Sequence, residues 1–367
     1  MPVWPQRLGV ILGEANAQGP LVAAGKRAAA AAGNSDALFA FYFSLTSIDS
    51  KCGCFDSAFY NSFVNAHPEW FLQDSGGNRL STFVYEYGAQ RQFAVDIGNP
   101  AFIDAWADWA LAAMAKYGWD GVWADNVLRG NFYGWSGWPT NPRTGARYTT
   151  TDYRRDMLAA LQRLRARFDA RGKVFIGNHA AAWEADTFSD PVVQQEITTM
   201  HGVEIEDCVY TFSGTPQSEA NWIAQVRYLD FANQHGVLTQ CRGGNGTVGD
   251  STKREYILAS YLLTKEGLSN VAQLNTLGNW WDGLAADLGA PLGRFTCLDP
   301  ANGLATSSMC PSTGKIYARE WERGRVFVNP TASTTVTVPL GETLLLNGSP
   351  VTSVTLGPHA GVVLVRP

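Results

Sequence analysis

Short apolar runs alternate with amphipathic helical stretches over residues 1–290, and this alternation constrains the fold more than any other feature. Apolar runs of this length are typical of buried parallel strands, and the helices between them complete βα units. Eight runs qualify as strands: RLGVIL from Arg7, ALFAFYF from Ala37, QFAVDI from Gln92, DGVWAD from Asp120, KVFIGN from Lys173, HGVEIE from His201, GVLTQC from Gly236 and LSNVAQL from Leu268. The sequence therefore predicts an α/β fold, a (β/α)₈ TIM barrel.

The helices between these strands carry recognisable ends. The segment 100–118 starts at a proline, has acidic residues near its beginning, and ends in Lys116 and Gly118. The segment 151–172 is apolar on one face and rich in arginine on the other. Two long excursions, about 44–90 and 127–150, follow the second and fourth strands. In a barrel they lie on the face that carries the active site, so we expect them to shape a substrate cleft.

The character of the chain changes after about Gly289. Helical periodicity ends, and alternating runs separated by Gly, Pro and Asn follow: KIYAREW, GRVFVNP, TTVTVPL, TLLLNG, SVTLGP and GVVLVRP. Alternation of this kind is typical of antiparallel strands with one buried face. We therefore predict a small C-terminal antiparallel β-sandwich domain at 291–367, after a catalytic barrel at 1–290.

Composition excludes two classes of protein and favours a third. A net charge of −5 without a basic stripe argues against nucleic acid as a partner, and no apolar run is long enough for a membrane span. The chain has 13 Trp and 13 Tyr, and rings near loops make flat platforms suited to sugar faces. Core packing accounts for some of these rings. The candidates for stacking lie in loops: Trp135, Trp138, Trp280 and Trp281.

The six cysteines have no spacing that suggests zinc. Cys297 and Cys310 could close a short disulfide loop in a secreted protein, and free buried thiols are an alternative. The first residues, MPVWPQRLGVIL, show neither the positive region nor the cleavage site of a secretory signal. The localisation stays open, and a secreted or a virion-associated protein is compatible with the sequence.

The strongest candidate for a catalytic residue is Asp125 in DGVWADN, where an apolar strand ends in a carboxylate followed by Asn126. A charge in that position is costly to bury without a purpose. Cleavage of an acetal needs a second carboxylate, so that one group protonates the leaving oxygen while the other attacks or activates water. HGVEIED supplies it: Glu204 and Glu206 point the same way along a strand, and Glu206 is nearer the tip. Glu204 and Asp207 remain alternatives for this role.

Other polar residues lie at predicted strand tips, where they could bind sugar hydroxyls. Asp96 ends the third strand, although it could instead fix Arg91 or cap the helix that starts near Pro100. His201, Gln240 and Asn275 are weaker candidates. The candidates that we carry forward for substrate binding, besides the aromatic residues, are Asp96, Asn126, Asn178, His179, Glu204, Arg242 and Gln273.

Taken in order, HPEWFLQDSGGN, VDIGNPAFIDAWADW, YGWDGVWADNV, HGVEIED, LGAPLGRF and REWERGRVFVNPT resemble the glycoside-hydrolase-like families of barrel proteins with an attached β-sandwich. The resemblance runs from about His67 to the end of the chain. It implies distant similarity to the retaining dextranase and α-glucosidase barrels, with Asp125 in the place of their nucleophile and Glu206 in the place of their acid/base.

The sequence thus predicts a glycoside hydrolase that retains configuration and needs no cofactor and no metal. By analogy, the substrate is an α-linked glucan or another microbial envelope polysaccharide. Two alternatives remain. Asp96, Asp125 and Glu206 could hold Mg²⁺ or Ca²⁺ in a metal-dependent hydrolase or lyase, or the barrel could bind carbohydrate without cleaving it.

Overall fold

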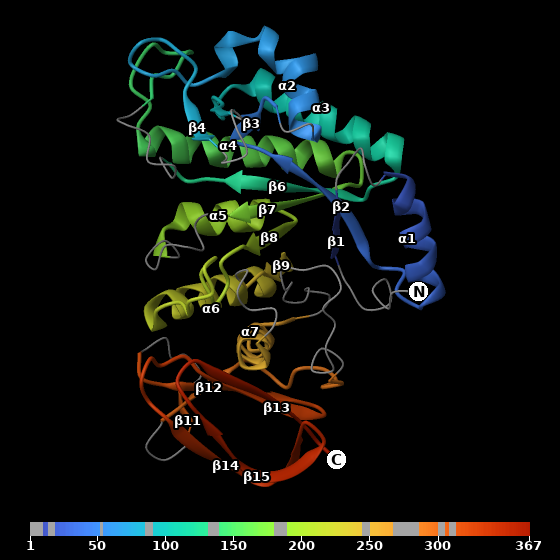
Figure 1. Cartoon of the computed structure of the whole chain (residues 1–367), viewed down its shortest axis with the longest axis vertical. Helices are drawn as coiled ribbons and strands as arrows, with labels where there is room; N and C mark the ends of the chain where they lie inside the picture. The colour runs from blue at the N-terminus through green and yellow to red at the C-terminus, as the bar shows by residue number, and fades with distance from the viewer. Residues whose placement is uncertain are drawn as a thin grey trace. The chain divides into compact units, whose positions relative to one another are not determined.

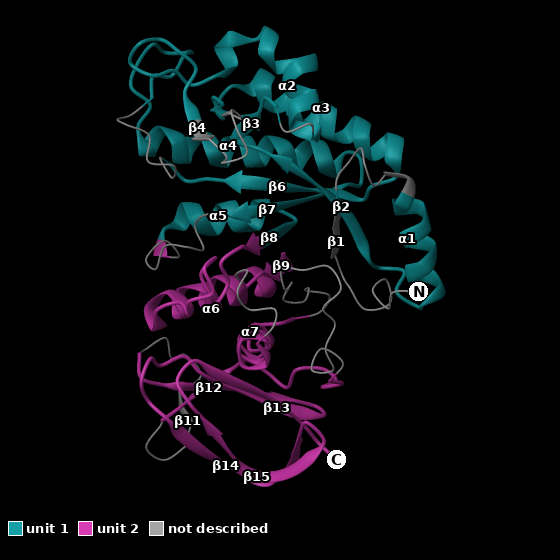
Figure 2. Ribbon diagram, viewed as in Figure 1, with its two compact units in different colours: residues 1–181, 190–203 teal, residues 182–189, 204–367 magenta. Residues whose placement is uncertain are grey.

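The computed structural model describes residues 10–13, 19–51, 54–84, 91–130, 139–179, 189–243, 250–266, 286–299, 305–307 and 313–367. The chain is drawn in Figure 1, and it divides into two compact units, which have different colours in Figure 2. The first comprises Met1–Ala181 and Asp190–Val203, and the second comprises Ala182–Ser189 and Glu204–Pro367. The division falls inside one strand, β8 (Gly202–Ile205). The domain boundary at 290/291 remains a prediction.

A parallel sheet forms the centre of the first unit. Its strands follow the order β1-β2-β6-β7, with the start of β8 next to β7. Their bounds are β1 Val10–Gly13, β2 Leu38–Ser44, β6 Gly121–Val127 and β7 Val174–His179. Adjacent residues, which point to opposite faces of the sheet, are both buried: Ala40 and Phe41 on β2, and Trp123 and Ala124 on β6. Burial of both faces explains why these strands appear in the sequence as continuous apolar runs.

Five α-helices and two short 3₁₀ turns accompany this sheet in the described part of the first unit. They are α1 Gly19–Ala31, α2 Phe55–Ser62, α3 Pro100–Tyr117, α4 Thr150–Asp169, α5 Pro191–Thr199, η2 Val64–Ala66 and η3 Pro68–Trp70. The predicted ends of α3 are confirmed. Asn99 accepts a hydrogen bond from the Ala101 N–H, Pro100 occupies the first turn, and Gly118 closes the helix with a φ of 79°. Figure 1 shows α3 and α4 side by side, and Arg163 of α4 pairs with Asp104 of α3.

The run QFAVDI, which we expected as the third barrel strand, belongs to a different sheet. It forms β5 (Arg91–Ala94), which lies between β3 (Ser47–Asp49) and β4 (Ser81–Val84) in an antiparallel sheet. The expectation was wrong because a short apolar run does not distinguish a parallel from an antiparallel strand. Its partners come from the segment 44–90, which the sequence had suggested was only a long loop.

The longer segment of the second unit, Glu204–Pro367, begins with the end of β8. Next to it is β9 (Leu238–Cys241), and the Arg242 N–H donates to the carbonyl oxygen of Ile205 at 2.9 Å. Two helices of this unit are described, α6 (Glu219–Gln234) and α7 (Ser251–Leu262). Of the eight predicted barrel strands, six correspond to β1, β2, β6, β7, β8 and β9, while LSNVAQL lies outside the described residues.

The C-terminal residues form the predicted antiparallel strands, in a sheet of order β11-β10-β12-β13-β16-β14-β15. Their bounds are β10 Thr296–Leu298, β11 Ala305–Ser307, β12 Ile316–Trp321, β13 Gly324–Asn329, β14 Val336–Leu346, β15 Ser349–Leu356 and β16 Ala360–Val365. Apolar residues of these strands share one core cluster, which includes Ile316, Val338 and Leu364. Helix α7 packs on β16 so closely that a Cβ at Gly361 would lie 2.6 Å from the Ala259 side chain.

None of the helices within the described ranges combines the length and the apolar character needed to cross a membrane.

Candidate functional site

The backbone is distorted where β6 ends. The pairing of β6 with β7 shifts register between Ala124 and Val127, so the irregularity contains Asp125 and Asn126. Asn126 has a φ of 60°, a left-handed conformation that asparagine tolerates better than most residues. The Thr46 hydroxyl secures this turn by donating to the Asn126 carbonyl oxygen at 2.6 Å. Bulges and left-handed residues of this kind often re-aim a side chain next to an active site.

The side chain aimed by this turn is the half-buried carboxylate of Asp125. Its Oδ1 accepts hydrogen bonds from the Asn126 N–H and from Asn178 Nδ2, both at 2.9 Å. Its Oδ2 accepts from the Tyr42 hydroxyl at 2.9 Å and from Asn126 Nδ2 at 3.2 Å. Four donors around one carboxyl group suit its ionised form. The structure thus brings together three predicted site residues, Asp125, Asn126 and Asn178, and adds Tyr42.

Asp96 lies in a separate buried cluster of the first unit. Its carboxylate is fully buried and pairs with Arg143, whose guanidinium also donates to Asp156 at 2.7 Å. Burial raises the pKa of Asp96, and the hydrogen bonds and charge of Arg143 oppose that rise. The Gly98 N–H also donates to Asp96. These contacts favour a structural role for Asp96 over sugar binding. The arginine that it holds is Arg143, whereas the sequence had suggested Arg91.

His179 faces a second buried group. Its Nε2 lies 3.1 Å from the Glu196 carboxylate, and both side chains are fully buried. Glu196 also pairs with Arg129, which donates in turn to Asp190 at 2.8 Å. Asn178 contacts Asp125, whereas its neighbour His179 contacts Glu196. The two residues at the end of β7 therefore belong to two different clusters of polar side chains.

In the second unit, Glu204 and Glu206 share one arginine. Arg242 Nε donates to Glu204 at 2.8 Å, and its Nη2 pairs with Glu206. The Glu204 side chain is fully buried, whereas that of Glu206 is 26% exposed. The greater exposure of Glu206 fits the prediction that it lies nearer the strand tip. The structure therefore brings Glu204, Glu206 and Arg242 together.

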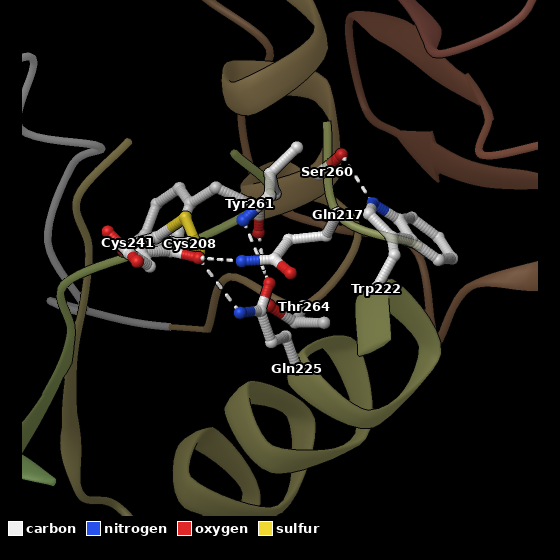
Figure 3. The surroundings of a disulfide bond; sticks show 10 residues. Cys208, Gln217, Trp222, Gln225, Cys241, Ser260, Tyr261 and Thr264 are labelled. Carbon is white, nitrogen blue, oxygen red and sulfur yellow. Dashed lines mark hydrogen bonds between the residues drawn. A yellow bond between two sulfur atoms is a disulfide. The ribbon is translucent and has the colours of Figure 1, made fainter. Parts of the chain in front are cut away.

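The backbone after Glu206 is firmly held, as Figure 3 shows. Gln217 and Gln225 each donate from Nε2 to the carbonyl oxygen of Asp207 at 2.9 Å. Gln225 also accepts from the Val209 N–H at 2.8 Å, where Val209 has a φ of 66°. Burial raises the pKa of the Asp207 carboxyl group, and the neighbouring charge of Glu206 acts in the same direction.

A disulfide between Cys208 and Cys241 joins the turn after β8 to the end of β9 (Figure 3). Cys54 and Cys297 are also disulfide-bonded. Free thiols, the alternative left open by the sequence, are therefore absent among the described cysteines. Cys310, the predicted partner of Cys297, lies outside the described residues.

Several predicted site residues also fall outside the ranges that the structure describes: Trp135, Trp138, Gln273, Trp280 and Trp281. Within those ranges, no group of three or more His, Cys, Asp or Glu side chains is arranged to hold a metal ion.

Sequence reasoning missed two kinds of residue. A hydrogen bond from Tyr42 was not predicted from the sequence, although this residue precedes Ser44, the register partner of Asp125, by two positions and so shares its face of β2. That spacing could have identified it. Arg143 and Gln225 are distant in sequence from their partners, and no local pattern marks them.

Comparison with known proteins identifies the family. The model described as hypothetical glycosyl hydrolase family 15 matches residues 41–325, and the chain belongs to this family. The predicted glycoside hydrolase is thereby confirmed at the level of the family, as is the resemblance drawn from the sequence. A glycoside hydrolase acts on a carbohydrate, which agrees with the predicted class of substrate. No curated protein sequence matches the chain.

Three solved structures illustrate the more distant similarities. The glycoside hydrolase domain of PelA from Pseudomonas aeruginosa is 13% identical over 65% of this chain and 77% of its own, with a TM-score of 0.40. The maltogenic α-amylase AmyB from Thermotoga neapolitana is 12% identical over 92% and 80%, with a TM-score of 0.45. An α-amylase from Malbranchea cinnamomea is 13% identical over 94% and 76%, with a TM-score of 0.47.

Proposed function

We propose that the protein hydrolyses O-glycosidic bonds of an oligo- or polysaccharide by a retaining double displacement, with Asp125 as nucleophile and Glu206 as acid/base. The observation that carries this proposal is the Asp125 carboxylate, which is held by four hydrogen-bond donors at the end of β6. A nucleophile must be ionised and fixed in orientation before it meets the anomeric carbon. The donors around Asp125 meet both requirements.

In the first step, an oxygen of Asp125 forms a bond to the anomeric carbon while the glycosidic C–O bond breaks. The electron pair of that bond goes to the leaving oxygen, which takes a proton from Glu206. In the second step, Glu206 removes a proton from water, and the water oxygen displaces Asp125 from the sugar. Retention of the anomeric configuration by this route requires the two carboxyl groups to lie about 5 Å apart during the reaction.

Solvent exposure supports the choice of Glu206 over Glu204. The two glutamates share the guanidinium, but Glu204 is fully buried, so only Glu206 keeps an exposed part that a substrate could reach. Asn126, Asn178 and Arg242 remain proposals for substrate binding, as do Trp135, Trp138, Gln273, Trp280 and Trp281, which lie outside the described residues. The side chains of Asp96, His179 and Glu204 are fully buried, and their ion pairs favour a structural role over contact with a sugar. The closed (β/α)₈ barrel and the two-layer sandwich are the finer parts of the fold that we propose.

The polymer is proposed by analogy to be an α-linked glucan or another microbial envelope polysaccharide. The test is to incubate the protein with a panel of bacterial and plant polysaccharides and to measure released reducing ends. We expect turnover of at least one polymer, and a loss of that turnover in Asp125→Asn without loss of binding. Asp125→Gly with added azide should then form a glycosyl azide of inverted configuration. Full turnover by Asp125→Asn would exclude this residue as the nucleophile.

A further inference from the structure

Hydrogen bonds reach the Asp125 carboxylate from both neighbouring strands. In the sheet order, β6 lies between β2 and β7. Tyr42 of β2 donates to Oδ2, and Asn178 of β7 donates to Oδ1, each at 2.9 Å. The carboxylate is therefore clamped from both sides, in addition to the bonds from its own neighbour Asn126.

The two clamping side chains are themselves fixed. The Tyr42 ring packs against Trp123 with ring centroids 5.4 Å apart, which restricts where its hydroxyl can point. Asn178 is only 2% exposed and lies on a strand whose neighbouring residue His179 is fully buried. The entropy cost of ordering these side chains is met when the protein folds. The donors around the carboxylate therefore need no rearrangement when a substrate binds.

We propose that Tyr42 and Asn178 are positioning residues for the nucleophile, holding Asp125 in one orientation until it attacks and restoring that orientation when the sugar is released. This inference rests on the proposed function of Asp125. Neither residue touches the bond that breaks in this account. Each acts by donating a hydrogen bond to the carboxylate.

The arrangement also distinguishes the two oxygens of Asp125. Oδ1 is held by a backbone N–H and by a buried amide, which cannot move far. Oδ2 is held by two side chains, and the O–H bond of a phenol can turn away while the ring and its oxygen stay in place. Oδ2 is therefore the oxygen that attacks the anomeric carbon, and Oδ1 becomes the carbonyl oxygen of the glycosyl ester. When water releases the sugar, the Tyr42 hydroxyl bonds again to the departing carboxylate oxygen.

Two substitutions test the clamp with little change in shape. Tyr42→Phe removes one donor and keeps the ring, whereas Asn178→Asp replaces a donor by a second negative charge. Both changes favour protonation of Asp125, the second more strongly than the first. Tyr148→Phe is the matched control, because the Tyr148 hydroxyl also donates to a carboxylate, that of Asp156, at 2.9 Å in the same unit.

The measurement is a pH titration of the full-length protein with ¹³C-labelled aspartate carboxyl groups, followed by NMR. The Asp125 resonance is the one that Asp125→Asn lacks. We expect its midpoint to rise by about one pH unit in Tyr42→Phe and by more in Asn178→Asp. It should not move in Tyr148→Phe. An Asp125 midpoint in Tyr42→Phe equal to that of the unaltered protein would overturn the inference.

Kinetics on a polysaccharide identified by the panel provide the second readout. Tyr42→Phe should lower kcat about ten- to hundred-fold, the loss typical of one hydrogen bond to a charged group. The acidic limb of its pH profile should move to higher pH, a change that a purely structural role would not cause. A profile that superimposes on that of the unaltered protein contradicts the inference even if Asp125→Asn is inactive. Absence of turnover in every polysaccharide would instead overturn the proposed function, and the NMR midpoints would still decide whether the clamp exists.

Discussion

Arg242 donates a hydrogen bond of 2.8 Å to the carboxylate of Glu204, whose side chain is fully buried. A buried charge that loses its partner is strongly destabilising, because neither water nor another ion replaces the lost interaction. We therefore expect Arg242→Leu to lower the free energy of unfolding by about 3 to 5 kcal/mol, measured by urea denaturation at neutral pH.

A matched control for that prediction is Arg323→Leu in the same unit. Arg323 pairs with Asp287, and their side chains are 53% and 76% exposed. Exposed ion pairs contribute about 1 kcal/mol or less, so this variant should change stability little. If the two variants lost the same free energy of unfolding, burial would not strengthen the Arg242–Glu204 pair.

The disulfide between Cys208 and Cys241 spans 33 residues of sequence. By restricting the unfolded chain, a cross-link of this length stabilises a protein by about 3 to 4 kcal/mol. The double variant Cys208→Ser with Cys241→Ser should therefore unfold at a lower urea concentration than the unaltered protein in the same non-reducing buffer. This comparison is more specific than adding a reductant, because Cys54 and Cys297 are also disulfide-bonded. Coinciding unfolding curves would contradict it.

Asp207 provides a prediction about pH. Burial raises the pKa of its carboxyl group above the usual value of 3.8, so the folded protein holds this proton more tightly than the unfolded chain does. The resulting stability is present below pH 3.8 and is lost as the pH rises through the raised pKa. Asp207→Asn has no such proton to lose.

Urea denaturation at a series of pH values from 4 to 7 measures this effect. The stability of Asp207→Asn relative to the unaltered protein should increase with pH and then level off, once Asp207 is ionised in the folded state. A difference that stays constant over this range, or that falls, would show that the pKa of Asp207 is not raised.

Much of the fold and part of the site could be predicted from local patterns. The end of β6 carries Asp125 as expected, because a charge that closes a buried strand is visible in the sequence. The shared orientation of Glu204 and Glu206 follows from the two-residue period of a strand, and both contact Arg242. Neither result required knowledge of distant residues.

What could not be predicted depends on contacts between distant segments. Asp96 is paired with Arg143, which lies 47 residues away in a loop, and nothing near either residue indicates the pair. The strand β5 has the composition of a barrel strand but pairs with β3 and β4, since hydrogen-bonding partners are chosen by the whole fold. The partner of Cys208 could not be chosen among six cysteines for the same reason.

The role of Glu206 as acid/base can be separated from that of Asp125 by varying the leaving group. An acid is needed most when the departing oxygen is strongly basic, and little when it is an activated phenol. On glycosides of the sugar identified by the panel, Glu206→Ala should lose about 10²- to 10⁴-fold of its turnover with poor leaving groups. With a dinitrophenyl leaving group, its first step should be nearly as fast as in the unaltered protein, giving a burst of phenol followed by slow hydrolysis of the glycosyl enzyme. Asp125→Gly should show no such burst with either substrate. A uniform loss across all leaving groups in Glu206→Ala would assign the proton transfer to another residue, and Asp207→Asn would be the next variant to assay.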